Sequence, residues 1–246
     1  MLPGLPDRRV DDDHHDRLQH RLEVAFRAAL GDRLAALVAY GSAADGTFIA
    51  GFSDFDLAVF LRGEFSPDDA VAAQAALGDL DPAPFDYLQT KFIDLSLPPT
   101  PTLVPDSYLV FAGSLPSEPA YLYNDASLRR SGRKWLDDLP ALIAADAAAW
   151  SVAAGSKRRR RLVRLMMTRL KPGLRAFLVE RGESPAAVWP MAWPDLAACW
   201  RQHDEEAAST LEKVLALLPP DGPQDERACG ALVLGLLQRI RAATCF

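Results

Sequence analysis

The chain has 246 residues, 49% of them hydrophobic, with a formal net charge of −6 and a pI near 5.3. One large or two small domains fit this length, and the apolar content can fill a substantial core. The acidic balance argues against a general nucleic-acid binder, which usually carries a basic surface. The charged N-terminus lacks the apolar segment of a signal peptide, and no apolar stretch is long enough to cross a bilayer. We therefore expect a cytoplasmic protein that binds neither nucleic acid nor membrane.

The first half of the chain alternates helix and strand patterns. In chain order it predicts a helix over 17–30, strands over 34–39 and 56–61, a helix over 67–77 and a long strand over 84–95. The first helix places Leu18, Leu22, Phe26 and Leu30 on one face. The proline-rich segment that follows the third strand is irregular, and a short returning segment is expected near residue 122.

Two aspartates open the second strand. Because successive side chains of a strand point to opposite faces, Asp54 and Asp56 project to the same face, with Cα atoms roughly 6.5–7 Å apart. Carboxylates at this spacing can share one or two Mg²⁺ ions, which prefer oxygen ligands and leave room for water and substrate phosphates. The sequence therefore predicts a magnesium site at Asp54 and Asp56.

A Gly-Ser pair ends the first strand. Gly41 permits a close approach of the backbone, and Ser42 supplies a hydroxyl and an N–H group. Ser53, just before the first aspartate, can hydrogen-bond a neighbouring group and fix its orientation. A lone Gly-Ser or Asp-x-Asp is common in loops, but the two in order, each attached to an apolar strand, favour a nucleoside triphosphate site that uses Gly41, Ser42 and Ser53.

At these residues the chain resembles the nucleotidyltransferase superfamily that includes DNA polymerase β and the small bacterial, aminoglycoside-type nucleotidyltransferases. The family pattern is an apolar residue, Gly-Ser, about ten residues, then Asp-apolar-Asp-apolar, and here it reads Tyr40-Gly41-Ser42 followed by Asp54-Phe55-Asp56-Leu57. The resemblance implies an α+β fold, in which a small mixed sheet flanked by helices precedes a C-terminal helical bundle. Small members often carry an arginine soon after Gly-Ser, whereas this loop carries Asp45.

The resemblance also implies a third acid on a later strand, and two residues are candidates for it. Asp86 and Asp94 share a face of the expected long strand but would lie roughly 26 Å apart, so one alone can reach the metal site. We favour Asp86, because Phe85-Asp86-Tyr87-Leu88 looks more like the family's element and follows the preceding helix more directly.

The second half of the chain predicts a bundle of four to six helices. The expected helices cover residues 126–150, 157–170, 193–202, 205–218 and 224–243. The first of them should break at Pro140, and a further helix should start at Pro172 and end near Gly182. We place the domains at 1–125, the nucleotidyltransferase domain, and 126–246, the helical domain. The three cysteines have no CxxC spacing, so neither a disulfide frame nor a zinc site is expected.

A basic cluster spans residues 157–175. A solvated helix face paired with acids is the simpler interpretation, with each pair contributing little. Alternatively, one or two residues such as Arg161, Lys171 or Arg175 neutralise the triphosphate or the leaving pyrophosphate. A basic groove for nucleic acid is the third interpretation. Three nearby tryptophans also have two interpretations: Trp189, Trp193 and Trp200 are either core residues or a wall on which a substrate stacks.

The leading hypothesis is a Mg²⁺-dependent nucleotidyltransferase. It moves a nucleoside monophosphate from a nucleoside triphosphate, with ATP favoured, to a hydroxyl of a small molecule and releases pyrophosphate. Asp54 and Asp56 would hold one or two Mg²⁺ ions, and Asp86 would complete the shell or serve as base. The alternatives are a protein-AMPylating antitoxin-type enzyme, which takes a protein acceptor, and a non-catalytic nucleotide-binding module. A homodimer is compatible with each of them.

Overall fold

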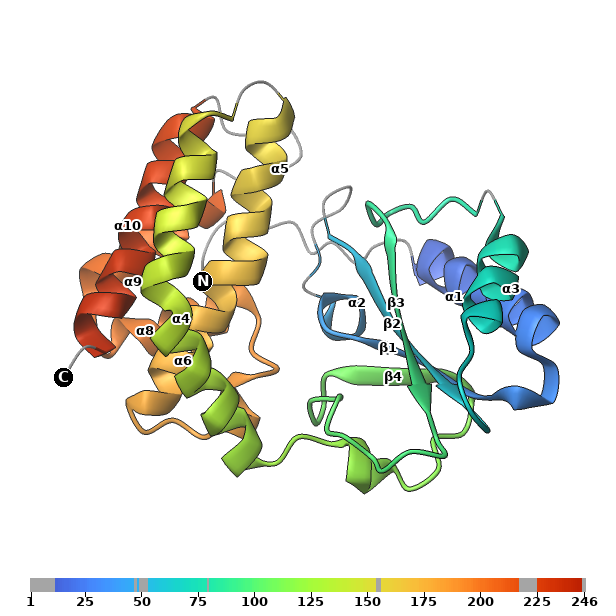
Figure 1. Ribbon diagram of the computed structural model, residues 1–246. Coiled ribbons are helices and arrows are strands. Elements are labelled where there is room, and N and C mark those ends of the chain that lie inside the picture. Colours follow the sequence, from blue (N-terminus) through green and yellow to red (C-terminus); the bar gives the residue numbers. More distant parts are fainter. Residues whose placement is uncertain are drawn as a thin grey trace. The chain divides into compact units, whose positions relative to one another are not determined.

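The computed structural model describes residues 12–46, 48, 53–78, 80–153, 156–216 and 225–244. The chain divides into two compact units, residues 1–123 and 124–246, against an expected boundary after residue 125. The fold is α+β: a unit with a mixed sheet precedes a helical unit (Figure 1).

The sheet of the first unit has the order β3-β2-β1-β4. Its strands are β1 (Leu34–Tyr40), β2 (Phe55–Leu61), β3 (Leu88–Asp94) and β4 (Tyr108–Gly113). β1 runs antiparallel to both of its neighbours, β2 and β4, whereas β2 and β3 are parallel. The sheet is therefore mixed, as the sequence predicts.

Two features of this sheet differ from the sequence-based expectation. The long strand expected over 84–95 is shorter, because residues 83–86 form turns and bends and pairing begins at Leu88. β4 was not expected at all. It is an edge strand with mostly half-exposed or exposed side chains, and the sequence-based prediction overlooked its apolar run over residues 108–112. The expected returning segment is an isolated parallel bridge between Leu103 and Leu122.

Two helices, α1 (Asp12–Leu30) and α3 (Pro67–Leu77), cover one face of the sheet (Figure 1). The expected apolar face of α1 is buried against the strands, which confirms the helical periodicity. The opposite face of the sheet packs against Leu103 and against Tyr121 of the short helix η2 (Glu118–Tyr121). Phe55 and Leu57 of β2 therefore point toward the helices, and Ala58 and Phe60 point to the other face.

The second unit is helical throughout its described residues. Its elements are α4 (Asp125–Ser151), α5 (Ser156–Leu165), the π-helical turn η3 (Met166–Leu170), α6 (Lys171–Glu180), α7 (Pro185–Val188), α8 (Trp193–Arg201), α9 (Glu205–Ala216) and α10 (Glu226–Thr244). Asn124 caps α4, accepting from the N–H of Ser127 at 2.9 Å. Gly182, with φ +105°, follows the end of α6, as expected for a C-terminal cap.

The expected break at Pro140 is wrong, because α4 runs through this residue without interruption. A proline inside a helix removes one N–H donor and crowds the preceding turn. Leu136, Leu139 and Ile143 lie on the buried side of the same stretch, so tertiary packing holds the helix together here.

Pro172 also leaves the helical path intact, and the chain passes through η3 before α6 begins. In a regular helix the carbonyl of Thr168 would accept from residue 172, which has no N–H because it is a proline. The Arg169 guanidinium donates to this carbonyl at 3.3 Å instead. The widened turn is thus the local response to the proline.

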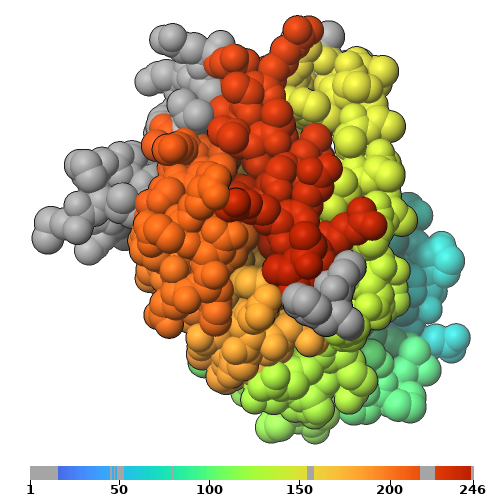
Figure 2. Space-filling view, turned by 90° about the vertical axis from the view of Figure 1, so that its left-hand side faces the viewer, coloured from blue at the N-terminus to red at the C-terminus, as the bar shows by residue number. Residues whose placement is uncertain are grey.

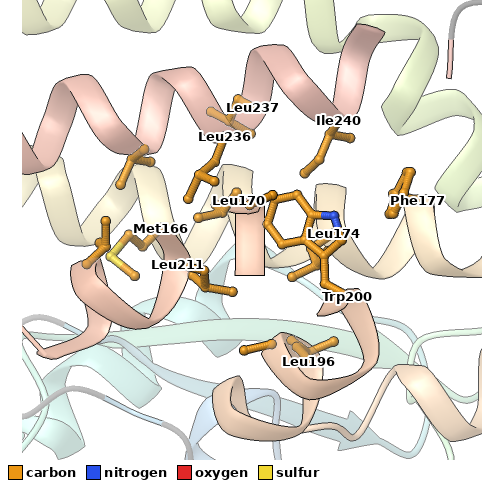
Figure 3. Close-up of a cluster of buried hydrophobic side chains, with 14 of the residues drawn as sticks. Met166, Leu170, Leu174, Phe177, Leu196, Trp200, Leu211, Leu236, Leu237 and Ile240 are labelled. Carbon is orange, nitrogen blue, oxygen red and sulfur yellow. The ribbon is translucent and has the colours of Figure 1, made fainter. Parts of the chain in front are cut away.

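The core of the helical unit is one large apolar cluster contributed by most of its helices. Figure 3 shows Trp200 of α8 among Leu174 of α6 and residues of α10 such as Leu237 and Ile240. Figure 2 shows α10, in red, between α9 and the stretch formed by α4 and α5 on the surface of this unit. None of the helices in the described part of the chain is long and apolar enough to cross a membrane.

Candidate active site

The two aspartates of the motif lie at the start of β2. Asp54 immediately precedes the strand and Asp56 is its second residue, and both are half-buried. Phe55 and Leu57 beside them are fully buried in the core under α1 and α3. Because side chains alternate along a strand, the two carboxylates point away from that core. The sheet thus presents a pair of acids on one face.

The electrostatics of this pair favour a cation. Burial, and after it the negative charge of Asp54, raises the pKa of Asp56 to about 7. Tyr40 pairs with Asp56 across the sheet. Burial raises the pKa of Tyr40 to about 12, and the charges of Asp56 and Asp54 contribute to this rise. Negative potential is therefore concentrated where β1 and β2 meet.

The donor set at this place consists of two carboxylates. Among the described residues, no three His, Cys, Asp or Glu side chains form a group that could hold a metal ion. Two carboxylate ligands suit Mg²⁺, which is commonly bound by one or two carboxylates together with waters and substrate phosphates. The pair therefore fits a magnesium ion that completes its shell with substrate oxygens.

Gly41 packs directly against the carboxylate of Asp56. Its φ is +65°, and a Cβ atom placed on it would lie 2.9 Å from Oδ2 of Asp56. Its N–H donates to the carbonyl of Ser107 at 3.3 Å, and its carbonyl accepts from the N–H of Ala44 at 3.0 Å. A residue without a side chain is therefore required where the short helix α2 (Ser42–Asp45) begins.

The backbone before β3 runs beside Ser53 and Asp54. The N–H of Asp86 donates to the carbonyl of Ser53 at 2.8 Å, and the N–H of Phe55 donates to the carbonyl of Tyr87 at 2.9 Å. The Tyr87 hydroxyl donates to Oδ2 of Asp54 at 3.0 Å. Ser53 is buried and Asp86 half-buried. The structure thus brings the backbone of Asp86 next to the aspartate pair.

Asp94, the other candidate for the third acid, lies at the far end of β3. It pairs with Leu61, five residues beyond Asp56 in β2, which corresponds to about 16 Å at the rise of a strand. Its carboxylate accepts from the N–H and hydroxyl of Ser96 and from the N–H of Phe65. The hydrogen bonds from Ser96 hold the pKa of Asp94 below its usual value. Asp94 therefore stabilises a loop away from the aspartate pair.

The basic and aromatic candidates of the helical unit lie mostly in its core. Lys171 is 3% exposed, with its Nζ 6.0 Å from the centre of the Trp193 ring. Arg175 donates to the carbonyl of Met191 at 3.4 Å. Trp193 and Trp200 are buried in the same apolar cluster, against which Trp189 also packs. Arg161 is exposed.

The sequence-based prediction did not include two neighbours of the pair, Tyr87 and Ser107. Tyr87 contacts Asp54 because β2 and β3 are parallel, a relationship that strand patterns do not encode. Ser107 holds the Gly41 loop from the position just before β4, the strand that the sequence-based prediction overlooked. The position of Tyr87, directly after the candidate acid Asp86, is the sequence signal that could have identified it.

Comparison with known proteins supports the fold. No protein-family model matches the sequence, and no curated protein matches it significantly. Among solved structures, spectinomycin adenyltransferase AAD(9) from Enterococcus faecialis, crystallised with ATP and spectinomycin, is similar with a TM-score of 0.52 and 13% identity. The match covers 92% of this chain and 98% of that chain.

Proposed function

We propose that this chain, which shares its fold with a nucleotidyltransferase over most of its length, is itself a Mg²⁺-dependent nucleotidyltransferase. It transfers a nucleoside monophosphate, from ATP by preference, to a hydroxyl of a small molecule and releases pyrophosphate. The observation that carries the proposal is the half-buried Asp54–Asp56 pair on one face of β2, packed against Gly41.

Asp54 and Asp56 would hold the magnesium. The raised pKa of Asp56 supports this role, because two negative charges in a partly buried place are costly without a cation. When bound, Mg²⁺ would neutralise the phosphate oxygens and the charge that develops on the leaving pyrophosphate. Tyr87 orients Asp54 through its hydroxyl, so one of the two carboxylates is fixed in advance.

The Gly41–Ser42 loop would position the phosphates. The N–H of Gly41 already bonds to Ser107, so Gly41 contributes by leaving space beside Asp56. Ser42 supplies its hydroxyl and its backbone N–H as donors. Ser53, through its backbone bond to Asp86, joins the strand that carries the aspartates to the segment before β3.

The reaction needs a base that takes the proton of the attacking hydroxyl, as well as a site that orients the substrates. The acceptor hydroxyl oxygen forms a bond to the α-phosphorus while the bond from this phosphorus to the bridging oxygen of pyrophosphate breaks. The hydroxyl proton passes to a nearby base. Asp86 is our candidate, either as this base or as a third metal ligand, because its backbone lies beside Ser53.

Calorimetric titration with ATP, with and without Mg²⁺, tests the proposal. We expect Mg²⁺-dependent binding that Asp54→Asn abolishes and Asp68→Asn preserves, since Asp68 is an exposed acid on α3 of the same unit. Pyrophosphate release in the presence of hydroxylated acceptors then tests turnover. Retention of the nucleotide on a protein would point to a protein acceptor instead. ATP binding that survives Asp54→Asn unchanged would remove the basis for the metal site.

A further inference from the structure

The helical unit contains a cavity that the nucleotidyltransferase proposal does not use. It measures about 280 Å³ and lies between α4 and the stretch formed by α5 and η3. Asp146 and Trp150 line it from α4, and Arg161, Arg164 and Arg169 line it from the other side. The volume is slightly below the usual range for small-molecule pockets, so its occupant is small.

The lining of this cavity is positive although the whole chain is acidic. It carries three arginines and one aspartate, whereas the chain has a formal net charge of −6. Asp146 is already engaged, because its Oδ2 accepts from Nε of Arg169 at 2.7 Å. Within the described part of the chain, the structure shows no carboxylate paired with Arg161 or Arg164. Two positive charges therefore remain uncompensated.

The positions of these two arginines bring their charges together. Arg161 and Arg164 are three residues apart on α5, so their side chains leave the same side of the helix. Like charges at this spacing destabilise a helix, and an anion between them removes the repulsion. A planar guanidinium donates two parallel hydrogen bonds, which match the oxygens of a phosphate group.

The rest of the lining is well defined. A Cβ atom on Gly230 of α10 would lie 2.0 Å from the Trp150 ring, so this ring packs directly on the backbone of α10. The widened turn η3 places Arg169 beside the cavity, and widened turns of this kind recur at functional sites. An aromatic wall opposite paired arginines suits a ligand with one anionic group and a compact body.

We propose that this cavity binds the phosphate group of a small phosphorylated molecule through Arg161 and Arg164. All the residues that line this cavity belong to the helical unit, whereas the Asp54–Asp56 pair belongs to the first unit. Phosphate binding is therefore tested independently of the transferase activity.

The test is calorimetric titration of the full chain with inorganic phosphate, without nucleotide or Mg²⁺ and against chloride at the same ionic strength. Arg161→Gln/Arg164→Gln should weaken binding tenfold or more. The matched control is Arg130→Gln/Arg227→Gln, which removes the same charge from exposed residues of the same unit and should bind like the unmodified chain. Asp146→Asn should bind several-fold more tightly, because it releases Arg169, and misfolding cannot produce that gain.

Each outcome of these titrations either supports or overturns the proposed phosphate site. Absence of saturable phosphate binding by the unmodified chain overturns the proposal, and so does equal weakening in the two double variants. If the Arg161/Arg164 variant does not fold, Asp146→Asn decides: tighter binding supports the site, and unchanged binding refutes it. Mg²⁺-dependent ATP binding is measured separately, so failure of one proposal does not imply failure of the other.

Discussion

The hydroxyl of Tyr87 donates a 3.0 Å hydrogen bond to Oδ2 of Asp54 and so ties the first site carboxylate to the segment that leads into β3. This bond fixes the direction in which Asp54 presents its oxygens. Tyr87 is 49% exposed, so the bond contributes little to the core. Its effect should therefore appear in ligand binding rather than in stability.

Tyr87→Phe should weaken Mg²⁺-dependent ATP binding by three- to tenfold, in line with the roughly 0.5–1.5 kcal/mol that a typical hydrogen bond contributes. The melting temperature should stay close to that of the unmodified chain. Tyr121→Phe is the control, because Tyr121 packs on Phe60 in the core of the opposite face. Equal losses of affinity in the two variants would show that the Tyr87 hydroxyl has no special part.

Gly41→Ala should abolish ATP binding or weaken it by more than tenfold. The new methyl group would press on the Asp56 carboxylate, which it would approach to 2.9 Å. The backbone of Gly41, with φ +65° and ψ −143°, also lies in a region that L residues rarely adopt, which adds about 1–3 kcal/mol of strain. Gly46→Ala separates the two effects, since Gly46 has φ +70° but no atom within 4 Å of an added Cβ. Because Gly46 lies in the left-handed helical region, with ψ 11°, this variant should lose less stability than Gly41→Ala and keep ATP binding.

Asp56 should titrate near pH 7 in the metal-free protein. An acid whose pKa is raised on folding stabilises the folded state below its unfolded pKa of about 4, and this stabilisation is lost as the pH rises through the folded pKa. The melting temperature should therefore fall between about pH 4 and about pH 7, and the fall should be smaller in Asp56→Asn. We expect that variant to be more stable at pH 8 by on the order of 1 kcal/mol.

Carboxyl NMR measures this titration directly. In Asp54→Asn the pKa of Asp56 should drop, because the neighbouring charge is gone, yet stay above its ordinary value, because burial is the larger cause. A titration near pH 4 in the unmodified chain would contradict the electrostatic picture of the site.

Gly113→Ala should destabilise the first unit by several kcal/mol. An added Cβ would lie 2.1 Å from the backbone oxygen of Ala35, and φ is +71°, so neither the strand nor its neighbour can yield cheaply. Gly235→Ala in α10 is the opposite case, with no atom within 4 Å of the Cβ. It should stabilise the helical unit by about 0.5–1 kcal/mol. Chemical denaturation of each variant measures both effects.

The sequence predicted those parts of the fold whose signal is local. The apolar periodicity of α1 and the apolar runs of β1 and β2 each stand alone, so their elements followed from the residues. Pro140 misled the prediction because a proline acts locally, whereas the packing of Leu139 and Ile143 that holds α4 together is tertiary. β4 is an exception, because its apolar run over residues 108–112 is a local strand signal that the prediction overlooked.

The same distinction between local and tertiary signals applies to the residues of the candidate site. Alternation along one strand placed Asp54 and Asp56 together. The sequence alone did not exclude Asp94 as a candidate for the third acid. The pairing of β3 with β2 places Asp94 at the far end of the sheet. The bond from Tyr87 likewise depends on strand pairing, which a single sequence does not record.

The hydrogen bond from Gly41 to Ser107 has a consequence for the order in which the chain folds. The donor lies just after β1 and the acceptor just before β4, with β2 and β3 between them in the sequence. Contacts between segments so far apart in the chain form slowly, because a long loop must close first. During synthesis the loop beside Asp56 therefore stays incomplete until β4 has emerged and paired. A nascent chain that stops before Ser107 carries both aspartates without the backbone support that sets the space between them.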